Sequence, residues 1–87
     1  MKNIPKPIKI KILYNEELKK ITGKYFEESI ISEGLSFVSL LYFIFSSYPE
    51  IKKRFPPGKL GLLLNNQKPN GYEILKEGDE IKLIGIK

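Results

Sequence analysis

Residues 36–49 read SFVSLLYFIFSSYP and carry the only long helical pattern in the chain. Ser36 can cap the first turn through its side-chain oxygen. Pro49 ends the helix because it disfavours helical backbone at the residue before it. Apolar side chains between these two residues recur at the spacing of one helix face, at Phe37, Leu40, Leu41, Ile44, Phe45 and Tyr48. We therefore predict one main helix that lies across a sheet.

The segments on either side of this helix have strand patterns. Residues 7–14, PIKIKILY, alternate isoleucine with lysine, as a half-buried strand does. Residues 25–31, 59–64 and 80–86 are also predicted strands, although the inward face of 25–31 stays ambiguous. Asn65 and Asn66 tolerate positive φ and predict a tight hairpin, followed by a short edge strand at 67–70.

Two shorter segments complete the expected order. Residues 15–24 are predicted to be a polar connection that Leu18 and Ile21 anchor to the core, and residues 50–55 to form one further helical turn. If the first and last strands lie side by side in the centre of the sheet, they must run parallel. One helix covers one face of the sheet and leaves the other in solvent. The expected fold is α+β: a ubiquitin-like β-grasp whose mixed four- to five-stranded sheet packs on one main helix.

Composition limits the chemistry that the chain can perform. Its 87 residues predict a single domain, 1–87, with no cysteine and no histidine. Disulfides, thiolate chemistry and the commonest metal ligands and general bases are therefore missing, so we expect no enzyme activity, no metal site and no cofactor. No segment has the pattern of a signal peptide or a bilayer span, so the expected location is the cytoplasm.

The net charge of +5 is a weak signal for a partner. The lysines are scattered, and no basic run is longer than Lys52-Lys53-Arg54. Nucleic-acid binding therefore remains the less favoured alternative to protein binding.

Several motifs resemble the sulfur-carrier proteins of the ubiquitin-like superfamily, namely the small subunit of molybdopterin synthase and the thiamine-pathway carrier. They are PIKIKILY with ITGKY, the segment SEGLSFVSLLYFIFSSYP, LLLNNQ and LKEGDEIKLI, in that order along nearly the whole chain. The resemblance implies a β-grasp fold and a protein partner, either an activating-type or a synthase-type enzyme.

The resemblance is incomplete at the C-terminal end. Carriers of this family end in Gly-Gly, whose carboxylate is adenylated and converted to a thiocarboxylate, whereas this sequence ends in Gly85-Ile86-Lys87. We expect a carrier-like protein-binding module without carrier chemistry. The alternatives are an active carrier whose diglycine tail is not represented and, from another class, a basic nucleic-acid-binding domain.

Two surfaces are candidate partner-binding sites. Strand alternation predicts an apolar centre on the open face of the sheet, formed by Leu13, Leu63, Ile84 and Ile86. Lys9, Lys11 and Lys82 form its predicted rim. The resemblance also implies partner binding on this face. The main helix keeps Val38, Tyr42 and Phe43 outside its core stripe. Either segment 15–24 or segment 51–55 of the chain folds over these three side chains, or a protein partner or a second copy covers them.

Overall fold

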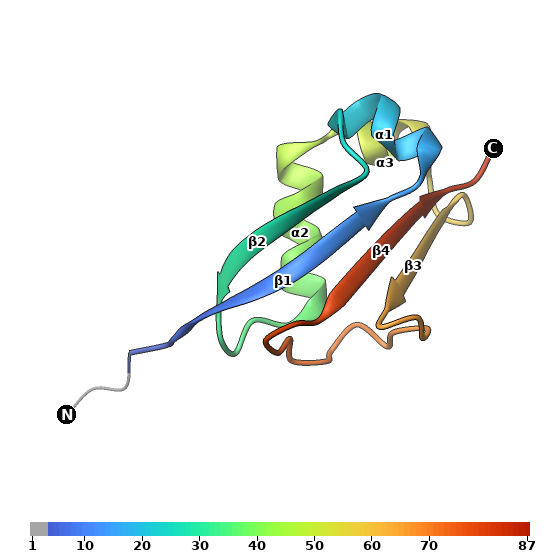
Figure 1. Cartoon of the computed structure of the whole chain (residues 1–87). Helices are drawn as coiled ribbons and strands as arrows, with labels where there is room; N and C mark the ends of the chain where they lie inside the picture. The colour runs from blue at the N-terminus through green and yellow to red at the C-terminus, as the bar shows by residue number, and fades with distance from the viewer. Residues whose placement is uncertain (1–3) are drawn as a thin grey trace.

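The computed structural model describes residues 4–87, and this part of the chain forms a four-stranded sheet with three helices (Figure 1). In chain order the elements are β1 (Pro7–Tyr14), α1 (Glu16–Thr22), β2 (Phe26–Ser32), α2 (Phe37–Ser47), α3 (Glu50–Arg54), β3 (Leu60–Leu64) and β4 (Glu80–Gly85). The long helix α2 crosses one face of the sheet. The short helices α1 and α3 lie together at the end of the sheet where β1 finishes.

The strand order is β2-β1-β4-β3, with the first and last strands of the chain side by side in the centre. β1 runs parallel to β4, while the two outer pairs, β1–β2 and β3–β4, are antiparallel. This mixed sheet is the β-grasp arrangement that the order of the elements predicted.

The core lies between the sheet and α2. Ile8, Ile10 and Ile12 of β1 are buried on the inner face, as their alternation with lysine predicted. The helix contributes Phe37, Leu40 and Ile44, and its other stripe residues are half-buried at the margins: Leu41, Phe45 and Tyr48. Ser36 caps α2 by accepting a hydrogen bond from the amide of Ser39.

The segment after β1 differs from its prediction, because residues 16–22 form a helix and not a connection. The Asn15 side chain accepts from the amide of Leu18, and Gly23 ends the helix in the left-handed region at φ 81°. Leu18 is fully buried, so the predicted anchor to the core is present. The short helix at 50–54 is confirmed, with Ile51 buried beneath it.

The hairpin after β3 is confirmed, but the return strand predicted at 67–70 was wrong. Asn65 and Asn66 have φ angles of 51° and 65°, as a tight left-handed turn requires. Only Gln67 then bridges back to Leu64. Pro69 has no amide hydrogen to extend this ladder, so the described sheet has four strands.

Candidate functional site

The open face of the sheet carries an apolar row that crosses all four strands. Leu13 of β1 lies opposite Phe26 of β2 on one side and Lys82 of β4 on the other, and Lys82 lies opposite Leu63 of β3. Residues opposite each other in neighbouring strands point to the same face. The row Phe26–Leu13–Lys82–Leu63, called here the open-face row, therefore places three of the predicted site residues side by side.

A groove adjoins this row at the β3 edge. It has a volume of about 470 Å³ and is called here the β3 groove; its lining residues are Leu60, Gly61, Leu62, Leu63, Lys68, Pro69 and Ile84. Gly61 lies opposite Ile84 and has no side chain, which leaves the isoleucine accessible from the open face. Ile86, beyond the end of β4, is 47% exposed. The five open-face residues predicted from the sequence thus lie on one continuous side of β1, β4 and β3.

The charges on this face differ from the predicted basic rim. Lys11 lies opposite Glu28 on one side and Glu80 on the other, so positive and negative side chains alternate across the sheet. Lys11 also places its Nζ 5.7 Å from the centre of the Phe26 ring. Lys82 lies inside the apolar row and donates to Asn66 Oδ1. A face with interleaved glutamates does not form the continuous basic stripe typical of nucleic-acid binding.

Sequence reasoning missed two apolar residues of the open face, Phe26 and Ile30. They are 54% and 63% exposed, and both lie on β2. In FEESIIS the alternation is weak, because both faces carry a glutamate and an isoleucine. Only the register with β1, in which Ile30 lies opposite Lys9, assigns the outward face.

The second candidate surface, on α2, lies on the other side of the molecule from the open face. Val38, Tyr42 and Phe43 are 49%, 71% and 55% exposed, and the last two rings contact edge to face at 6.1 Å. Neither of the segments considered as covers, 15–24 and 51–55, buries these side chains. Whether a partner covers them remains a prediction.

Gly85, at the end of β4, is held by hydrogen bonds to Asn15 and by packing on Phe55. Its amide donates to Asn15 Oδ1 at 3.0 Å, and its carbonyl accepts from Asn15 Nδ2 at 2.9 Å. A Cβ atom on Gly85 would lie 2.8 Å from the Phe55 ring, so a larger residue there would force the ring to shift. The next amide, of Ile86, donates to the Lys59 carbonyl. This glycine therefore holds the end of β4 against α1 and α3.

A polar cluster lies beside the core, where β2 meets the end of β1. The Tyr14 hydroxyl donates to the Glu27 carboxylate, which also pairs with Lys24 at 3.4 Å. Burial, followed by the contact with Glu27, raises the pKa of Tyr14 above its usual range. The Glu27 carboxylate raises the pKa of Lys24. Tyr14 therefore stays a neutral hydrogen-bond donor, and the cluster is a satisfied structural network.

Two other kinds of site can be considered for the described residues, a metal site and a membrane-spanning helix. Across residues 4–87, no three acidic, histidine or cysteine side chains gather as a metal site would require. In the same residues, no helix has the length and apolar character needed to cross a bilayer.

Comparison with known proteins identifies the fold. No protein-family model and no curated protein sequence matches the chain. Among solved structures, the chain is similar to a Pyrococcus furiosus protein assigned as molybdopterin converting factor, subunit 1, with a TM-score of 0.79 and 20% identity over 92% of this chain and 99% of that one. It is also similar to small archaeal modifier protein 1 of Haloferax volcanii, with a TM-score of 0.75 and 15% identity over 92% and 99%.

A third solved structure is described as a ubiquitin. It is the protein from Caldiarchaeum subterraneum, and it matches at a TM-score of 0.61 and 17% identity over 94% of this chain and 96% of that one. At these identities the likeness concerns the fold. The chain therefore has the ubiquitin-like β-grasp fold of the molybdopterin converting factor subunit and the archaeal modifier protein, as the sequence motifs predicted.

Proposed function

We propose that this chain is a non-catalytic protein-binding module that docks a partner protein on the open face of its sheet. The observation that carries this proposal is the open-face row, Phe26–Leu13–Lys82–Leu63, with the β3 groove beside it. An apolar centre, a concave pocket and flanking charges are the anatomy of a protein interface. The chain also lacks the histidine and cysteine side chains that most often act in catalysis.

The solved structures with this fold suggest the class of partner. One is assigned to a molybdopterin converting factor and another is a protein modifier. We therefore take the partner to be a synthase-type or activating-type enzyme of a sulfur-transfer or modifier pathway. The alternating charges of Glu28, Lys11 and Glu80 would select such a partner by complementary charges rather than by its phosphates.

The proposed module does not use Gly85 as a carrier end. This glycine is bonded on both sides to Asn15 and packed on Phe55, so it is unavailable to enter an enzyme's channel while the fold is intact. The second candidate function, an active sulfur carrier, is favoured by the similarity to the converting factor subunit. One mass measurement separates the two. Incubation with ATP, a sulfur donor and an activating enzyme should leave the mass unchanged, whereas replacement of one oxygen by sulfur would establish the carrier.

Docking itself can be mapped with the isotope-labelled chain. Titration with the activating or synthase enzymes encoded in the same genome should shift the amide signals of Leu13, Leu63, Lys82 and Ile84. Leu63→Asp should weaken this binding at least about fivefold, since it removes an apolar side chain from the row and puts a carboxylate opposite Lys82 in its place.

The matched control is Tyr72→Asp, which changes a highly exposed side chain outside the open face. It should bind as the unmodified chain does. Shifts confined to the helices, or the absence of binding to every enzyme of both classes, would contradict the proposed docking face.

A further inference from the structure

In the described part of the chain, the outer edge of β2 is open. Hydrogen bonds from Tyr14 to the Tyr25 carbonyl and from Glu33 to the Lys6 carbonyl set the phase of the β1–β2 ladder. The backbone amide and carbonyl groups of the odd-numbered residues of β2 therefore point toward β1. Those of Phe26, Glu28 and Ile30 point away from it. Within residues 4–87, β1 is the only strand that pairs with β2. This edge offers three consecutive pairs of backbone donors and acceptors to another strand.

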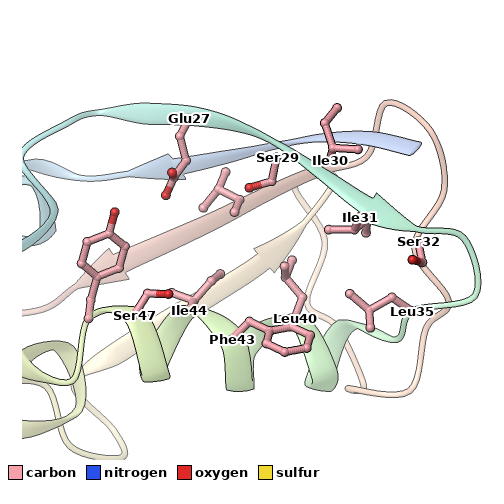
Figure 2. Close-up of a pocket in the computed structure, with 12 residues that line it drawn as sticks. Glu27, Ser29, Ile30, Ile31, Ser32, Leu35, Leu40, Phe43, Ile44 and Ser47 are labelled. Atoms are coloured by element: carbon pink, nitrogen blue, oxygen red, sulfur yellow. The ribbon is translucent and has the colours of Figure 1, made fainter. Parts of the chain in front are cut away.

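A groove runs along the same edge, between β2 and α2. It has a volume of about 500 Å³ and is called here the β2–α2 groove. Its apolar walls are Ile30, Ile31, Leu35, Leu40, Phe43 and Ile44. Figure 2 shows Ser29 and Ile31 of β2 pointing across it toward Leu40 and Ile44 of α2. The groove exists because α2 covers the centre of the sheet and leaves the inner face of β2 only half-buried.

The groove has no free charge, whereas the open side of the edge does. Glu27 lines the groove, but its carboxylate already accepts from Tyr14 and pairs with Lys24. Glu28, on the open side, is exposed. A strand laid along this edge would therefore place apolar side chains in the groove and find a carboxylate on the open side. Basic side chains suit that position.

β1, which pairs with the other edge of β2, shows which side chains suit a neighbour of this strand. It presents Ile10 and Ile12 to the inner face and sets Lys11 opposite Glu28 on the open face. The free edge of β2 likewise has the apolar groove on its inner side and the Glu28 carboxylate on its open side. An alternating apolar–basic strand is therefore complementary to both edges of β2.

We propose that the free edge of β2 and the β2–α2 groove bind an extended segment of a partner protein, antiparallel to β2, in which apolar residues alternate with lysine or arginine. Main-chain hydrogen bonds to Phe26, Glu28 and Ile30 provide the affinity. The apolar side chains enter the groove, and a basic side chain lies opposite Glu28. This site adjoins the open face, with which it shares Phe26 and Glu28, but the strand edge and its groove do not depend on the function proposed for that face.

A second copy of the chain fits this edge less well. Antiparallel pairing of β2 with itself, in the register that sets Phe26 opposite Ile30, also sets the two Glu28 carboxylates opposite each other. Directly opposed like charges destabilise a strand pair. The edge therefore favours a basic strand over its own sequence.

A peptide with the sequence of residues 7–14, acetylated and amidated at its ends, is the probe. We expect saturable binding to the whole chain with a Kd below about 1 mM. In the antiparallel arrangement the lysine amides face β2 and the isoleucine amides face away. Methylation of the backbone amide nitrogens of the two lysines should therefore abolish binding. Methylation of the backbone amide nitrogens of the second and third isoleucines should preserve it.

Two protein variants with matched controls locate the peptide. Glu28→Lys should weaken binding at least about fivefold, and Glu16→Lys, with the same charge change on α1, should not. Phe43→Ala removes an exposed wall of the groove and should weaken binding, while Tyr72→Ala removes an exposed ring outside it. Thermal melts of all four variants would confirm that they are folded.

Three outcomes would overturn the proposal. One is no binding at about 1 mM peptide. The second is equal loss with both methylated peptides, because the backbone contacts would then not follow the β2 edge. The third is a dimer in light scattering that the peptide dissociates, because a second copy would then occupy the edge.

Discussion

Glu73 holds the turn that supports the start of α2. Its carboxylate accepts from the amides of Asn70 and Gly71 at 2.8 and 2.9 Å. The carbonyls of Glu73 and Gly71 in turn accept from the amides of Phe37 and Val38. Two amides of the first turn of α2, which have no partner within the helix, are thereby satisfied. One side chain thus orders a loop that completes a helix more than thirty positions earlier in the chain.

This arrangement predicts a pH dependence. Hydrogen bonds from backbone amides, that of Asn70 first, lower the pKa of Glu73. Its stabilising contribution is present above the pKa of the unfolded carboxyl group and is lost as the pH falls through the lower folded pKa. Glu73→Gln should therefore lower the Tm at neutral pH, and the difference from the unmodified chain should shrink in acid. Glu16→Gln, which removes a carboxylate from an exposed position, is the control. Melting curves that differ equally at every pH would contradict the proposed role of the charge.

Single residues were predictable where a local pattern determines them. Asn65 and Asn66 took positive φ because a tight hairpin demands it, and β1 buried its isoleucines because strand side chains alternate. The role of Gly85 was not predictable in this way. It depends on Asn15 and Phe55, which lie 70 and 30 positions away, and no local pattern records such contacts.

At the scale of elements, α2 provides a graded test of the helix-on-sheet packing. Ile44 is buried, whereas Leu41, on the same stripe, is half-buried at its margin. Ile44→Ala should lower the free energy of unfolding by about 2–5 kcal/mol, because it leaves a cavity against the sheet. Leu41→Ala should cost less, since more of its side chain is already in water. Urea denaturation measures both values. An Ile44→Ala midpoint equal to that of the unmodified chain would contradict the packing of α2 on the sheet.

The elements that sequence reasoning misjudged are the short ones. α1 has seven residues, too few for a helical stripe to stand out, and its stability comes from Asn15 and Gly23 at its ends and from Leu18 in the core. The segment at 67–70 follows a tight hairpin but makes only one bridge, because Pro69 cannot donate. Whether such short segments form a helix or a strand depends on tertiary contacts and on the available backbone hydrogen-bond donors. Neither can be read from a hydrophobic pattern.

At the scale of the whole molecule, the β-grasp topology of residues 4–87 leaves the open face, the edge of β2 and the outer side of α2 in solvent. The first was predictable, since one helix covers one face of a sheet. The extension of the open-face row to Phe26 and the β2–α2 groove were not. Both depend on the register of β2 and on the placement of α2 over the centre of the sheet. The weak alternation of β2 and the apolar stripe of α2 determine neither of these.

The outer side of α2 leads to a prediction about association. Tyr42 and Phe43 are both more than half exposed, so their replacement by lysine should leave the fold intact and the Tm nearly unchanged. Two adjacent exposed aromatic rings are nevertheless costly to leave in water, because each can bury on the order of 150–250 Å². We therefore expect the unmodified chain to associate with a protein partner or a second copy through this side, and the double variant to lose that association. Light scattering over a range of concentrations, beside a thermal melt, tests self-association, with Tyr72→Lys as a control for an added charge elsewhere. A double variant that unfolds would show that the two rings stabilise the monomer instead. An unmodified chain that stays monomeric at high concentration would rule out the second copy and leave the partner protein as the cover.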